Sequence, residues 1–370
     1  FAPDATYMAI DLQYGPDGAV YLIDWTDIQH CHNPRDEIWD RTNGRIYRVS
    51  WAATYQPKQV NLSTRSDVEL AALHTHPSEW YVRTARRLLQ ERAASRPIEA
   101  AALTALRAQA SSSTAEVTTQ LRALWTLHVT NNLDAAGLNA ALSHSSEYVR
   151  GWAVALGTER RDHLALATAT LARLAANDPS PLVRLAVAAA VPALPLAARW
   201  SVASALAAHG EDAGDRYLPK MVWFALAPTV AADVPRALDL AAQTPLASLA
   251  DSITWYAART AVGREQISSR VAAPALAAAT AARTLRVLAF ALETEAGLAM
   301  PAAWARVTAR FAPTTDPTVR GAWEQLSALF GDKTVLGPVR TRLADKSTPL
   351  TERRRALDLL RRAGDSESTV

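Results

Sequence analysis

The stretch NDPSPLVRLAVAAAV, residues 177–191, decides the fold because it is the unit that the chain repeats. Asp178 and Pro179 predict a helix start, since a carboxylate accepts hydrogen bonds from free amides and proline fits a first turn. Apolar residues then recur at steps of three and four, which predicts one apolar stripe along the helix. Arg184 lies beside this stripe, where its guanidinium could reach a carboxylate or carbonyl of a neighbouring repeat. The stripe consists of Leu182, Val183, Ala186, Val187, Ala190 and Val191.

The same pattern returns three more times, with its arginine at Arg83, Arg150 and Arg320. Together with Arg184, these arginines are separated by 67, 34 and 136 residues, close to two, one and four steps of 34. The step predicts further helices centred near 117, 218, 252, 286 and 354, and each of these points lies in an apolar-periodic segment. Because a second helical run precedes each, the sequence indicates a mainly α fold, an α-solenoid of about nine helix pairs.

The type of solenoid follows from the residues that the repeat contains. A step of 34 residues also fits tetratricopeptide and ankyrin repeats, but the signature residues of both are missing. The order of an acid or serine, then Val-Arg, then alanine resembles short HEAT-type repeats. The sequence therefore predicts a HEAT-like array over residues 65–370, which a linker at 57–64 connects to the preceding part of the chain.

Charge and apolar patterning narrow the class of partner. The chain has 39 basic and 36 acidic residues and a formal net charge of +3, a balance that gives no reason to expect nucleic acid. No apolar run reaches the roughly 18 residues that a membrane-spanning helix needs, so no membrane-spanning segment is expected. The array is instead expected to bind a protein or peptide on its concave face.

Residues 1–56 follow a different pattern, which predicts strands. Tyr7–Tyr14 alternates in polarity, Ala19–Trp25 is apolar on both faces, and Gly44–Trp51 gives a third segment. Gly-Pro-Asp-Gly at 15–18 is a dense turn signal between the first two. The sequence predicts a small antiparallel β-sheet with the second strand inside, which resembles most of one four-stranded blade of a β-propeller.

Three pieces of sequence carry a more specific resemblance: GPDGAVYLIDW at 15–25, Cys31-His32-Asn33, and RTNGRIYRV at 41–49. They resemble the closing blade in the family of membrane-bound dehydrogenases that run from a sugar-dehydrogenase-like propeller through HEAT-like repeats to a c-type haem-binding module. The resemblance covers nearly the whole chain and implies a bacterial protein in a periplasmic or other extracytoplasmic location. Most blades and the Cys-x-x-Cys-His haem motif are missing, so we expect a fragment that binds no cofactor itself. The quinone cofactor and the c-type haem would then belong to other segments.

Reactive side chains concentrate in the loop at 24–45, which joins the second and third predicted strands. His30, Cys31 and His32 are candidate metal ligands, because imidazole and thiolate bind transition metals. The candidate cofactor- or ligand-binding residues are Asp24, His30, His32, Asp40 and Arg45. The alternative is a structural polar network in which Arg45 pairs with Asp40 and holds the loop against the sheet.

Two further sets of residues could serve a site or the core. His74 and His76 follow the first helix, and they either complete a metal site with the loop histidines or cap helix carbonyls. Four tryptophans fall two to five residues after the reference position of the repeat, on the second helix, which predicts packing toward the core. They are Trp152, Trp223, Trp255 and Trp323.

Two functions of different class fit these observations, and in neither does this chain catalyse a reaction alone. The first is a non-catalytic scaffold or spacer in a quinoprotein-like sugar or polyol dehydrogenase that is linked to a c-type cytochrome. The alternative is a stand-alone HEAT-repeat interaction scaffold with the sheet as a cap. No nucleophile elbow, phosphate-binding loop or dinucleotide glycine pattern occurs, so no catalytic residue is assigned.

Overall fold

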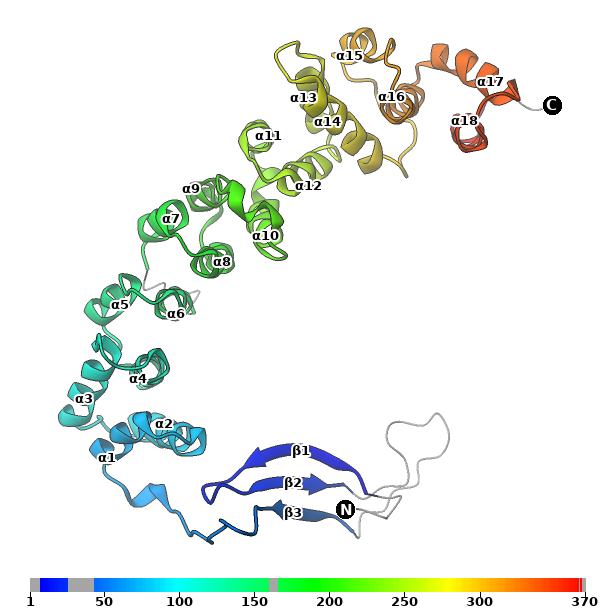
Figure 1. Cartoon of the computed structure of the whole chain (residues 1–370). Helices are drawn as coiled ribbons and strands as arrows, with labels where there is room; N and C mark the ends of the chain where they lie inside the picture. The colour runs from blue at the N-terminus through cyan, green and yellow to red at the C-terminus, as the bar shows by residue number, and fades with distance from the viewer. Residues whose placement is uncertain (1–6, 26–42, 160–165, 366, 368–370) are drawn as a thin grey trace. The chain divides into compact units, whose positions relative to one another are not determined.

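The computed structural model describes residues 7–25, 43–159, 166–365 and 367 (Figure 1). The chain forms two compact units, Phe1–Ala153 and Val154–Val370. Within the described residues there are three strands and eighteen α-helices, and the helices follow one another as nine pairs. This confirms the prediction of a mainly α solenoid preceded by a small antiparallel sheet.

The first unit contains the sheet and the first helix pairs. Its strands are β1 (Ala9–Tyr14), β2 (Val20–Asp24) and β3 (Arg45–Val49). Its helices are α1 (Asp67–Ala72), α2 (Glu79–Ala93), α3 (Ala100–Ser111), α4 (Val117–Val129), α5 (Ala135–Leu142) and α6 (Glu147–Thr158), the last of which continues into the second unit.

The second unit contains the remaining pairs. The first helices of these pairs are α7 (Thr168–Asn177), α9 (Leu196–Leu206), α11 (Val234–Gln243), α13 (Ala261–Ala272), α15 (Trp304–Phe311) and α17 (Leu336–Ala344). The second helices are α8 (Pro181–Ala190), α10 (Leu218–Val230), α12 (Ala247–Ala257), α14 (Ala278–Ala291), α16 (Pro317–Leu329) and α18 (Leu350–Arg362). Each even-numbered helix from α8 to α16 contacts the next even-numbered helix, so the second helices form one layer of this unit (Figure 1).

The sheet has the predicted order, with β2 between β1 and β3 and both pairings antiparallel. Its apolar side chains are only partly covered, although the sequence predicts a buried inner strand. Ile10, Ile23 and Ile46 are aligned across the three strands, and all three are more than 40% exposed. The opposite face exposes Leu12 and Val49, so apolar surface is open on both faces within the described residues.

The first helix pair is anchored by a buried carboxylate. Ser66 and Glu69 form a capping box at the start of α1, which satisfies free amides of the first turn. The side chain of Asp67 is fully buried and accepts hydrogen bonds from Arg96 and Arg92 at 2.8 Å. These hydrogen bonds, those from Arg96 first, hold the pKa of Asp67 well below its usual range. The contacts of Asp67 with the two arginines thereby fasten α1 to the end of α2.

The helix of the repeated unit at 177–191 begins two residues later than the sequence predicts. The helix α8 is capped by Ser180, whose hydroxyl accepts from the amides of Leu182 and Val183, and Pro181 occupies the first turn. Asp178 instead accepts the Ser180 amide at 3.0 Å and shapes the turn before the helix. The predicted arrangement of cap and proline does occur at α16, where Asp316 caps and Pro317 follows.

The apolar stripe faces the core at the same point of each of the four repeats. Val183 and its counterparts in the other three repeats are at most 5% exposed. Those counterparts are Val82, Val149 and Val319. Leu182 was expected in the stripe, but it is 36% exposed because it lies on the flank of α8.

Arg184 confirms the expected contact with a neighbouring repeat. It is 2% exposed and donates through Nε and Nη2 to the carboxylate of Asp212, at 2.7 and 2.5 Å. Asp212 lies in the short 3₁₀ segment Gly210–Gly214, which precedes α10 in the next helix pair. A third bond joins Nη1 to the carbonyl of Asp178 at 2.9 Å. The bidentate geometry fixes both distance and direction between consecutive pairs.

The other repeat arginines bind within their own repeat. Arg150 donates to the carbonyl of His144, and Arg320 donates to that of Thr314, in each case six residues earlier. Arg184 makes the same contact with Asp178, so three of the four arginines fasten the turn that precedes their helix. Arg83 differs, because its side chain is 73% exposed and lies 3.9 Å from Glu79 of the same helix.

Candidate functional site

The predicted metal loop lies outside the described residues, as do His30, Cys31, His32 and Asp40. Those four assignments, and the pairing of Arg45 with Asp40, therefore stay predictions. Among the residues that the structure does describe, no group of three or more histidine, cysteine or acidic side chains could hold a metal ion.

Asp24 and Arg45 are the described members of the predicted ligand set, and they lie opposite each other on β2 and β3. Asp24 is 3% exposed and accepts the amide of Met8 at 3.0 Å, which ties the start of β1 to the end of β2. Its carboxylate is 3.9 Å from the guanidinium of Arg45, a half-exposed side chain. A contact of that length contributes little energy. The hydrogen bond from Met8 joins two strands, and it favours a structural role for Asp24.

His74 follows α1 and caps its carbonyls, as one of the two alternatives for this residue predicts. Its Nδ1 lies 3.1 Å from the carbonyl oxygen of Ala71, which can only accept, so Nδ1 carries the hydrogen. Its Nε2 lies 2.6 Å from the hydroxyl of Thr126 on α4. The ring is fully buried, and this burial lowers the pKa of His74 to about 4. His76 also has a structural contact, because its Nδ1 accepts the amide of Ser78.

The buried, neutral state of His74 should make the first unit less stable in mild acid. Its pKa is about 6.5 in the unfolded chain and about 4 in the folded chain, so the unfolded state binds the extra proton between these values. The contribution of His74 to the free energy of unfolding is therefore fully present above pH 7, and it falls by roughly 3 kcal/mol as the pH is lowered to 4. Urea denaturation from pH 7 to pH 4 should show this loss, and the His74→Gln variant should lose less over the same range. Equal slopes for both proteins would contradict this assignment.

None of the four repeat tryptophans is fully buried, so the prediction from their spacing holds only in part. Trp152 is 43% exposed, and the other three are half-buried. Their neighbours differ, and Trp323 donates to the hydroxyl of Thr308 on α15 and packs against a buried cluster that includes Val335 and Leu360. Trp152 meets Trp125 at 4.9 Å between ring centres, and Trp223 meets Tyr256 at 5.7 Å.

Two open pockets follow one another along the even-numbered helices of the second unit. The first has a volume of about 550 Å³ and is lined by α10, α12 and α14, with Trp223, Trp255 and Phe290 among its walls. The second has a volume of about 400 Å³ and lies over α14, α16 and α18. Both are lined by Arg286 and Phe290, so they adjoin each other along the helices, and together we call them the arginine groove.

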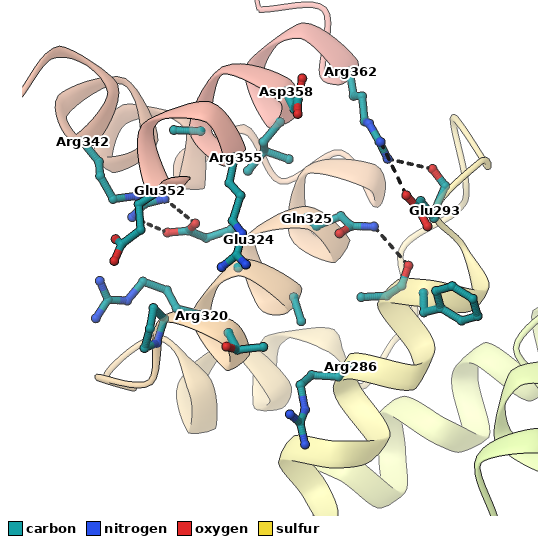
Figure 2. A pocket seen from close by; sticks show the side chains of 18 residues that line it. Arg286, Glu293, Arg320, Glu324, Gln325, Arg342, Glu352, Arg355, Asp358 and Arg362 are labelled. Atoms are coloured by element: carbon teal, nitrogen blue, oxygen red, sulfur yellow. Dashed lines mark hydrogen bonds and ion pairs between the residues drawn. The ribbon is translucent and has the colours of Figure 1, made fainter. Parts of the chain in front are cut away.

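Figure 2 shows how charged side chains surround the second of these pockets. Arg342 donates to the carboxylate of Glu324, a residue that is only 4% exposed, at 2.5 and 3.0 Å. Arg362 and Glu293 form a second, more exposed pair at 3.7 Å. These pairs account for two of the arginines that line this pocket.

No protein-family model and no curated protein matches the chain.

Three arginines of the groove have no salt bridge among the described residues: Arg286, Arg320 and Arg355. Arg320 donates to a neutral carbonyl, and Figure 2 shows Arg286 on α14 and Arg355 on α18, two helices that both contact α16. The carboxylates of Glu352 and Asp358 line the same pocket, so the pocket keeps one more positive than negative charge. The sequence shows these residues only as part of a balanced charge pattern, because nothing in it reveals which arginines lack a partner.

Proposed function

We propose that the chain is a non-catalytic scaffold that binds a protein or peptide on its layer of even-numbered helices. The arginine groove is the observation that carries this proposal. Its two adjoining pockets follow successive helices and expose aromatic rings and arginines, the side chains that are enriched at binding hot spots. Among the described helices, none combines the length with the apolar character that would let it cross a lipid bilayer.

The sheet supports a more specific version of this function. A propeller blade packs against a neighbour on each face, and this sheet exposes aligned isoleucines on one face and Leu12 and Val49 on the other. We therefore propose that the sheet is one blade of a quinoprotein-like sugar or polyol dehydrogenase. The helix pairs would then be the spacer toward a c-type cytochrome in an extracytoplasmic location, with quinone and haem on other segments.

Selection of phage-displayed random peptides on the purified chain tests the scaffold function. We expect peptides to be enriched, and we expect substitutions on the even-numbered helices to weaken their binding. Dye-linked oxidation of sugars and polyols should stay at the background rate. The proposal would be overturned by turnover well above background, or by a selection that enriches no peptide.

A further inference from the structure

We infer that the arginine groove binds an acidic peptide segment whose carboxylates pair with Arg286 and Arg355 and whose apolar side chains rest on Phe290 and Trp255. This inference rests on the proposed scaffold function and adds the chemistry of the partner.

The charge of the groove favours a partner with carboxylates. Arg286 and Arg355 make no hydrogen bond or salt bridge within the described part of the chain, and both are exposed. After the amides of Val319 and Thr318, the charge of Arg286 also lowers the pKa of Asp316, although the two side chains form no ion pair. A guanidinium presents a planar set of donors that matches a carboxylate, and such pairs are stronger than neutral hydrogen bonds. By contrast, Arg342 is already committed to Glu324 and holds α17 to α16. The free cations therefore belong to the groove surface and are not needed for the packing of these helices.

The apolar surface of the groove lies beside these cations. Phe290 is 68% exposed and belongs to both pockets, directly next to the position of Arg286 one helical turn earlier. Trp255 is half-buried, and the guanidinium of Arg259 lies 4.7 Å from its ring centre. Exposed aromatic rings beside unpaired cations favour a ligand that alternates carboxylates with apolar side chains.

The length of the groove favours a peptide over a small anion. It crosses five successive even-numbered helices, α10 to α18, and packed helices lie about 10 Å apart, so it extends over roughly 40 Å. An extended peptide of about a dozen residues covers that distance. Nucleic acid fits less well, because the lining of the second pocket has only one more positive than negative charge, whereas a nucleic acid would place a phosphate on it at every nucleotide.

Peptides from the selection described above provide the test, measured one by one by fluorescence anisotropy on the full chain. We expect the enriched peptides to combine aspartate or glutamate with leucine or aromatic residues. Arg286→Glu and Arg355→Glu should each weaken binding about tenfold or more, and added salt should weaken binding to the unaltered chain. Glu352→Gln should strengthen binding, because it removes a like charge from the wall of the pocket.

Matched controls make the same charge change elsewhere. Arg354 is exposed on α18 but does not line the groove, and Arg306 is exposed on α15 in the other layer. Arg354→Glu and Arg306→Glu should leave the affinity unchanged, and circular dichroism melting should show that all variants fold.

Each outcome separates this inference from the scaffold function. Peptides that are rich in lysine or arginine, or whose binding survives both groove substitutions, would overturn the acidic-peptide inference and leave the scaffold function standing. Binding of an oligonucleotide that is tighter than that of any selected peptide would also overturn it. A selection that yields no peptide at all would overturn both.

Discussion

Replacing Arg184 with leucine should destabilise the helices α8–α10 by about 3–5 kcal/mol. The change removes both donors to Asp212, which is 4% exposed, and the donor to the carbonyl of Asp178. A buried carboxylate would then have no cation in contact with it, and the cost of its desolvation would no longer be offset. Since Asp212 precedes α10 while Arg184 lies on α8, the loss should loosen the connection between two consecutive helix pairs.

Hydrogen–deuterium exchange is the suitable measurement, because repeat proteins open locally and amide protection reports each region separately. Amides of α8–α10 should lose protection in Arg184→Leu, whereas those of α2 should not change. The double variant Arg184→Leu/Asp212→Leu should recover part of the loss, because no unpaired charge remains. If the double variant were less protected than the single one, the buried pair would not be the cause.

Replacing Val183 with aspartate should cost about 4 kcal/mol or more, an effect of similar size with a different origin. Val183 is fully buried in α8, and a carboxylate at this position would lie in apolar surroundings with no donor beside it. Urea denaturation should show a lower midpoint or the loss of folded protein.

Leu182 provides the control for this substitution, because it is the adjacent residue and 36% exposed. Leu182→Asp introduces the same charge with access to water, so it should cost no more than about 1 kcal/mol. Similar losses from both substitutions would mean that the apolar stripe does not face the core.

The period of the sequence predicts the helix pairs because each pair buries the same face against its neighbours. A valine that recurs before an arginine is enough to place the core at each of these repeats. The start of α8 is less predictable: Asp178 and Ser180 are both good caps, and both precede a proline. Only the hydrogen bonds show that Ser180 caps the helix while Asp178 caps the turn.

The groove could not be predicted from the same pattern. Spacing alone cannot tell a tryptophan in the core from one on the flank of a helix, because these directions differ by only part of a turn. Nor does it show that Arg342 is paired while Arg355 is not, since the partner of Arg342 is Glu324 on another helix. Such pairings depend on contacts between helices, and the local sequence does not encode them.

The hydrogen bond from a repeat arginine to the carbonyl six residues earlier should affect how the chain responds to force. Because Arg150, Arg184 and Arg320 each secure a corner within a single module, tension on the chain ends should rupture the modules one after another. The force–extension curve would then show a series of small peaks instead of one large event.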